Sequence, residues 1–288
     1  MGLALVISGL FLSPLETGEW LNDFKASTER ARKEDKDLLV LFTGSDWCSW
    51  CIRLDREVFS REGFTLEARK RFVLVELDFP RRLEQPEKIR EQNEALKKQF
   101  AITLWPTVYL LDARGRPYAK TGYEAGGEKK YLKRLEALRK RKEIRDRALK
   151  AATSAKGLER ARHLDKALSS VGDLAELADF YADIVAEIKT LDADNKGGLK
   201  FKYSSWIVRT ALRGGDFDGA LKKLEVLMRS MPLEGLSKQE AYYLKGTTLN
   251  QKEDLEGSIA AFKVALSAAP KSKRGKSLRA ILRALQED

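Results

Sequence analysis

The stretch that decides the fold runs from Leu38 to Cys51 and reads LLVLFTGSDWCSWC. Its first five residues are a continuous apolar run of strand length, which is typical of a strand buried on both faces of an α/β sheet. A polar break follows, and the next apolar residues, Cys51, Leu54 and Val58, take a helical spacing on one face. The two cysteines are therefore predicted to lie at a strand-to-helix junction.

Strands and helices alternate on both sides of this junction. The patterns predict strands at 72–78, 107–111 and 118–121, and helices at 87–100 and from 128 onward. A first helix is predicted with Trp20, Leu21 and Phe24 on its apolar face. The order α-β-α-β-α-β-β-α over residues 17–148 predicts a small α/β domain.

The strand signals stop after this domain, and residues 149–288 are predicted to form an all-α domain. The stretches 202–232 and 241–270 look like two copies of one unit, in which two helices precede a proline. The two prolines are 38 residues apart, close to the tetratricopeptide period of about 34. The second copy resembles that repeat, whereas the first has Val208 at the position of Gly246.

The only two cysteines of the chain are three residues apart, which indicates redox chemistry. A structural disulfide framework needs several scattered cysteines. A thiolate attacks disulfides, and the positive end of a helix lowers the pKa of a thiol placed there. We therefore predict that Cys48 attacks, that Cys51 on the buried face resolves the mixed disulfide, and that the two form a Cys48–Cys51 disulfide when oxidised.

Composition argues against several other kinds of site. The single histidine, His163, and the lack of a second C-x-x-C argue against zinc or copper handling, and we predict no metal and no cofactor. The net charge is +11, and residues 129–150 hold eleven Lys or Arg against three acidic residues. We interpret this run as a solvated helix face. Nucleic acid is not an expected partner, since no nucleic-acid-binding motif is present.

The segment 1–16 is an apolar run that is too short for a membrane span, which needs about 20 residues. It is similar to the apolar core of a secretory signal peptide, although a positively charged start and a small-residue cleavage site are missing. A buried N-terminal strand is the alternative. We expect an extracytoplasmic protein, periplasmic or secreted, with a cytoplasmic location as the other possibility.

Two motifs together carry a family resemblance. Trp47-Cys48-Ser49-Trp50-Cys51 after a buried strand, and Trp105-Pro106-Thr107 before another, resemble the thioredoxin superfamily over about residues 17–148. With Glu57-Val58-Phe59 and Gly122-Tyr123, the pattern is similar to bacterial secreted thioredoxin-like proteins that often carry helical repeats. The resemblance implies a cis peptide bond before Pro106, packed beside the two sulfurs, and pairing of the preceding backbone with extended substrate.

The resemblance implies a protein thiol–disulfide oxidoreductase with Cys48 and Cys51 as catalytic residues. Its partners would be disulfide or dithiol proteins, a reducing or oxidising redox protein, and a protein bound by the helical repeats. The substrate-binding rim is predicted at the residues Trp47, Trp50, Trp105 and Pro106.

Other interpretations stay open. Trp47 could instead pack the loop against the sheet. Two departures from the family are Trp105, where a small or β-branched residue is usual, and Phe42, where cytosolic thioredoxins have a buried aspartate. The alternative function is a non-catalytic scaffold, in which the repeats bind partners and the cysteines form only a structural disulfide.

Overall fold

The computed structural model describes residues 20–172 and 178–287. The signal-like segment predicted at 1–16 lies outside these described residues. Within the two described ranges, no helix combines the length and the apolar character that crossing a membrane would require.

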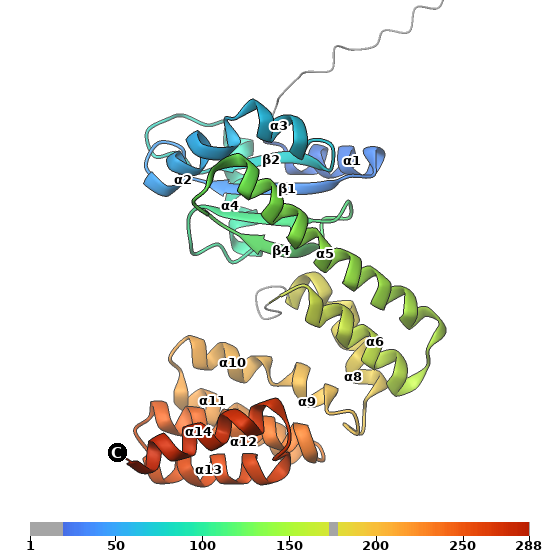
Figure 1. Ribbon diagram of the computed structural model, residues 1–288, viewed down its shortest axis with the longest axis vertical. Helices are drawn as coiled ribbons and strands as arrows, with labels where there is room; N and C mark the ends of the chain where they lie inside the picture. Colours follow the sequence, from blue (N-terminus) through green and yellow to red (C-terminus); the bar gives the residue numbers. More distant parts are fainter. Residues whose placement is uncertain (1–19, 173–177, 288) are drawn as a thin grey trace, which may run out of the picture. The chain divides into compact units, whose positions relative to one another are not determined.

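The chain divides into two compact units, and the division falls within a single long helix. One unit reaches Gly115 and resumes at Lys120–Leu138, while the other contains Arg116–Ala119 and continues from Arg139. The division between Leu138 and Arg139 falls inside α5 (Gly127–Ser154), so each unit includes a part of this helix (Figure 1). The boundary predicted after residue 148 also falls in α5, and it stays a prediction.

A four-stranded mixed sheet forms the centre of the N-terminal part of the chain. Its order is β2-β1-β3-β4, with β1 (Asp37–Thr43) parallel to β2 (Phe72–Asp78) and antiparallel to β3 (Thr107–Leu111). The edge strand β4 (Pro117–Thr121) follows β3. Every residue of β1 is buried, as the continuous apolar run predicted, because helices cover both faces of the sheet. The predicted strands are confirmed.

Two separate groups of aromatic rings show which helices cover each face. The helices of this part of the chain that precede α5 are α1 (Phe24–Glu34), α2 (Ser49–Leu54), the π-helical turn η1 (Asp55–Phe59), α3 (Glu62–Ala68) and α4 (Glu87–Gln99). On one face, Phe100 at the end of α4 packs against Phe24 of α1 and Phe42 of β1. On the other, Phe59 of η1 packs against Phe64 of α3 and Tyr131 of α5.

The first helix is shorter than predicted, because Trp20 and Leu21 precede it. Asp23 is its N-cap and accepts a hydrogen bond from the backbone N–H of Ala26 at 2.9 Å, which favours a helix start at Phe24. Leu21 instead forms a parallel bridge with Val75 and exchanges two backbone hydrogen bonds with β2. These bonds satisfy part of the outer edge of the sheet.

The helix after the cysteines is also divided rather than continuous. It changes from α2 to the π-helical turn η1 and stops before α3 begins at Glu62. The predicted apolar face is nevertheless confirmed, since Cys51, Leu54 and Val58 are all buried.

The rest of the chain is largely helical, as predicted. Its elements are α6 (Gly157–Ser170), the 3-10 helix η2 (Ala178–Tyr181), α8 (Ala182–Leu191), α9 (Leu199–Ser204), α10 (Trp206–Arg213), α11 (Phe217–Ser230), α12 (Gly235–Gln251), α13 (Leu255–Ala268) and α14 (Lys273–Glu287).

Two helix pairs in this region begin their second helix in the same way. Asp216 caps α11 by accepting the backbone N–H of Gly219, and Asp254 caps α13 by accepting that of Gly257, both at 2.9 Å. The two caps are 38 residues apart in the chain. The spacing of the two prolines therefore has a counterpart in local structure.

The two pairs fill their interiors with opposite combinations of small and large residues. A side chain at Gly246 would meet the ring of Phe262 at 2.6 Å, so only glycine permits this approach. The residues 38 positions earlier are Val208 and Leu224, which are buried in one hydrophobic cluster. The larger residue on the first helix is matched by a smaller one on the second, which conserves volume as cores require.

Candidate active site

The two cysteines lie where β1 leads into α2. Cys48 is the N-cap of α2, and its Sγ accepts a hydrogen bond from the backbone N–H of Cys51 at 3.2 Å. The two are joined in a disulfide with Cα atoms 5.2 Å apart. Cys48 is 7% exposed and Cys51 is 3% exposed, so Cys48 is the more exposed of two largely buried residues.

The segment before β3 lies beside this junction. Thr107 pairs with Phe42, so the antiparallel register brings Pro106 opposite the end of β1, where the loop to Cys48 begins. The Trp105–Pro106 peptide bond is cis, as the family resemblance implied. Pro106 is buried and Trp105 is half-buried.

The tryptophans predicted as one rim fall into two groups. Trp47 and Trp105 pack edge to face with ring centroids 5.7 Å apart. Trp50 is 52% exposed and packs instead against Tyr123, at 5.2 Å between centroids. The Arg53 guanidinium lies 5.7 Å from the centre of the Trp50 ring. The structure therefore brings two of the predicted rim residues together and gives the third different neighbours.

Trp50 borders a small charged network. Glu57 accepts hydrogen bonds from the Arg53 guanidinium at 2.7 Å and from the Tyr123 hydroxyl at 2.8 Å. These two donors lower the pKa of the Glu57 carboxyl below its ordinary value, with Arg53 the larger cause. The hydrogen bond to Glu57 orients Tyr123, whose ring contacts the exposed Trp50.

A loop from Phe79 to Gln85 flanks the Trp47 side of the site, and Asp46 holds it. The Asp46 carboxylate accepts hydrogen bonds from the backbone N–H groups of Arg81, Arg82 and Leu83. These bonds, that from Arg81 first, lower the pKa of the Asp46 carboxyl. Trp47 adds an indole N–H hydrogen bond to the Phe79 carbonyl at 2.7 Å. Sequence patterns did not reveal this arrangement, because it joins residues about 35 positions apart.

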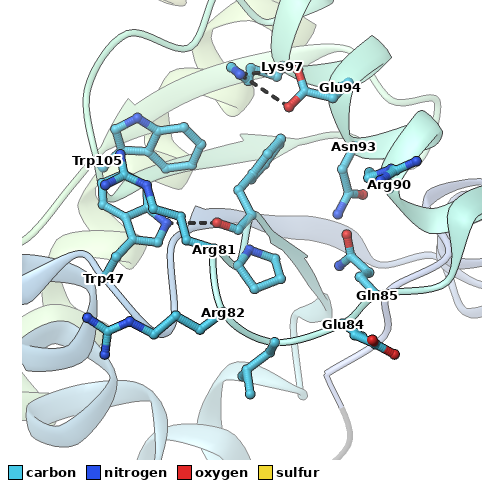
Figure 2. A pocket seen from close by; sticks show the side chains of 13 residues that line it. Trp47, Arg81, Arg82, Glu84, Gln85, Arg90, Asn93, Glu94, Lys97 and Trp105 are labelled. Carbon is cyan, nitrogen blue, oxygen red and sulfur yellow. Dashed lines mark hydrogen bonds and ion pairs between the residues drawn. The ribbon is translucent and has the colours of Figure 1, made fainter.

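A groove with a cavity volume of about 800 Å³ lies between this loop and α4 (Figure 2). We call it the aromatic–basic groove, and define it by the residues Trp47, Phe79, Arg81, Arg82, Lys97 and Trp105. Trp105 packs against Phe79 at 5.0 Å between ring centroids. The Arg81 guanidinium stacks on the Trp47 ring at 4.0 Å, a geometry that favours a cation–π interaction.

Phe42 lies on the face of the sheet opposite to α2. Phe42 contacts Phe100 and Tyr109 on the face covered by α1 and α4, so it does not lie beneath α2. Because side chains alternate along a strand, Leu41 faces α2 instead, and its register partner Glu76 shares that face. Burial raises the pKa of Glu76 to about 7, and the charges of Asp78 and Asp55 add to the effect.

Metal binding has no support in the described residues. Among residues 20–172 and 178–287, no group of three or more His, Cys, Asp or Glu side chains is arranged to hold a metal ion.

Removing the Asp46 carboxylate is expected to loosen the 79–85 loop. In Asp46→Ala the amides of Arg81, Arg82 and Leu83 lose their acceptor, so their hydrogen–deuterium exchange should accelerate. The matched control is Glu84→Ala, which removes an exposed carboxylate from the same loop. Acidification should act like the substitution only at low pH, because the lowered pKa keeps Asp46 ionised until the pH falls through it. Unchanged exchange in Asp46→Ala would contradict this role.

The geometry of the sheet, the cysteine pair and the cis-proline segment defines a thioredoxin fold, and comparison with known proteins agrees. The thioredoxin-like domain family matches residues 24–139. The disulfide bond reductase DsbH of Chlamydia pneumoniae is 33% identical over 119 residues, which cover 41% of this chain and 71% of that protein. The chain belongs to the thioredoxin-like family.

Two further matches are of similar extent. The thioredoxin-related protein DsbJ of Chlamydia pneumoniae is 32% identical over 128 residues, covering 42% of this chain and 37% of that protein. A solved structure described as DsbH oxidoreductase has 30% sequence identity and a TM-score of 0.40, and the match covers 45% of this chain and 92% of that one. These matches span less than half of the chain.

Proposed function

We propose that this protein is a thiol–disulfide oxidoreductase that reduces protein disulfides. The observation that carries the proposal is the Cys48–Cys51 disulfide at the start of α2, beside a cis-proline segment. The similarity to a protein named disulfide bond reductase supports the direction of the reaction.

The proposed reaction begins with the dithiol form. The Cys48 thiolate attacks one sulfur of a substrate disulfide, which forms a mixed disulfide and releases the other substrate sulfur as a thiolate. Cys51 then loses its proton and attacks the Cys48 sulfur, which releases the second substrate thiol and forms the Cys48–Cys51 disulfide. Two electrons pass to the substrate, and an external dithiol protein returns the pair to its reduced form.

Several surface residues are proposed to hold the substrate. Trp47 and Trp105 form one contact surface beside Cys48, and Pro106 sets the backbone that an extended substrate would meet. Trp50 offers a second, exposed ring on the other side. Aromatic rings near a reactive sulfur suit recognition of unfolded or extended protein segments.

The helical region is proposed to bind a partner protein. The repeated Asp216 and Asp254 caps and the matched interiors of α10–α11 and α12–α13 support tetratricopeptide-like units. We also propose an extracytoplasmic location, on the basis of the signal-like segment 1–16. The alternative proposal is a scaffold with a purely structural disulfide. Such a protein would not accelerate disulfide reduction.

Insulin reduction by dithiothreitol tests the proposal. The purified full-length chain is expected to accelerate precipitation of the insulin B chain well above the rate with dithiothreitol alone, because Cys48 supplies a faster attacking thiolate. Protein whose cysteines have first been alkylated is the control and should show only the background rate. Equal rates with and without unmodified protein would favour the scaffold.

A further inference from the structure

We infer that the aromatic–basic groove docks the acidic part of a substrate polypeptide that flanks the disulfide being reduced. The inference rests on the proposed function and adds a substrate class to it. Its cavity volume of about 800 Å³ falls within the range of about 300–1,000 Å³ that is usual for ligand clefts.

Two residues that line the groove are chain neighbours of the redox pair and of the cis-proline. Trp47 immediately precedes Cys48, and Trp105 immediately precedes the cis-proline. Each residue of an extended chain advances about 3.3 Å. A substrate whose sulfur is bonded to Cys48 therefore places its next few residues over the ring pair of Trp47 and Trp105.

The charges in the groove are unevenly distributed. Figure 2 shows Arg81 and Arg82 beside Trp47, whereas Glu84 and Gln85 lie at the far end. Lys97 is already paired with Glu94 at 3.1 Å. The end next to Cys48 thus carries two arginines, while the Asp46 carboxylate there is engaged by three backbone N–H groups of the loop. The two guanidinium charges therefore favour Asp or Glu close to the substrate cysteine.

These arginines are displayed by a backbone that is fixed in advance. The N–H groups of Arg81 and Arg82 both bind the Asp46 carboxylate, whereas neither guanidinium takes part in these bonds. Among the described residues, no side-chain hydrogen bond or ion pair involves the Arg82 guanidinium. A preorganised loop with an available cation loses little conformational freedom when an acidic segment binds.

Two matched peptides test the inference. Each contains one disulfide, and they differ only in having Asp or Lys beside each cysteine; kcat/KM is divided by the rate constant of each peptide with dithiothreitol alone. We expect the acidic peptide to be preferred by about five- to tenfold at low ionic strength, and the preference to shrink in about 0.5 M salt, because exposed ion pairs are weak and screened.

Substitutions test whether Arg81 and Arg82 cause the preference for the acidic peptide. Arg82→Gln should lower the acidic-to-basic ratio, and Arg81→Gln combined with Arg82→Gln should bring it close to one. Arg82→Gln leaves the stacking of Arg81 on Trp47 in place. A lower ratio in this variant therefore cannot be attributed to loss of that contact. The matched control, Lys25→Gln with Lys33→Gln, neutralises two exposed cations of α1 and should keep the wild-type ratio.

The failures of the two proposals are distinguishable. Equal normalised kcat/KM for the two peptides in an enzyme that turns both over would overturn this inference alone. A ratio that survives in the double arginine variant would do the same. Loss of all catalysis, with insulin and with both peptides, would overturn the proposed function and this inference with it.

Discussion

Replacing Cys48 by serine is expected to lower insulin reduction to the rate of dithiothreitol alone. The reason is chemical, since a serine hydroxyl does not attack disulfides, and the remaining cysteine, Cys51, is only 3% exposed. Cys48 is also the N-cap of α2, and serine is itself a favourable N-cap residue. The variant should therefore fold, and unchanged far-ultraviolet circular dichroism would verify this.

Cys51→Ser is the matched variant with a different expected result. Its Cys48 can still attack, but nothing resolves the product, so the protein should accumulate as a mixed disulfide with its substrate. Mass spectrometry of the acid-quenched reaction would detect this adduct in Cys51→Ser and its absence in Cys48→Ser. An adduct on Cys51 in Cys48→Ser, with none on Cys48 in Cys51→Ser, would reverse the assignment of the attacking and resolving cysteines.

Glu76→Gln is expected to stabilise the protein at alkaline pH. Burial raises the pKa of Glu76 to about 7 from its ordinary value of 4.5, so the folded state binds a proton that the unfolded state has already lost. Stability therefore decreases as the pH rises from about 5 to about 8. Glutamine keeps the shape and removes this cost, which is on the order of 3 kcal/mol once both states are ionised.

Urea unfolding of wild type and Glu76→Gln at pH 5 and pH 8 measures this effect. The gain of the variant should be large at pH 8 and small at pH 5, because Glu76 is protonated and uncharged in the folded protein at the lower pH. Glu62→Gln, which removes an exposed carboxyl of α3, is the control and should show no comparable dependence. Equal stabilities of wild type and Glu76→Gln at pH 8 would refute the prediction.

Local patterns predicted most of the thioredoxin-like part. The apolar run of β1, the helical face of Cys51, Leu54 and Val58, and the strand β4 were all predictable, because each depends on neighbours in the chain. The cis peptide before Pro106 followed from the family resemblance. Trp20 and Leu21 were assigned to the first helix because their spacing fits a helix as well as an irregular segment.

The surroundings of the cysteines were much less predictable. The sequence showed that Phe42 stands where cytosolic thioredoxins have a buried aspartate, but it did not show that this side chain faces α1 and α4. In a strand, a difference of one residue moves a side chain to the opposite face. The number of residues between a strand and a helix does not reveal which face each side chain takes.

The sequence by itself determined the reactive groups on which the proposed function rests: two cysteines three residues apart at a strand–helix junction, with Cys48 at the N-cap. Only the tertiary structure decided what surrounds them. Asp46 meets the backbone of the 79–85 loop, and Glu76 reaches the α2 face through its register with Leu41. Local periodicity carries no information about such contacts, because they depend on strand pairing and loop closure between residues about 35 positions apart.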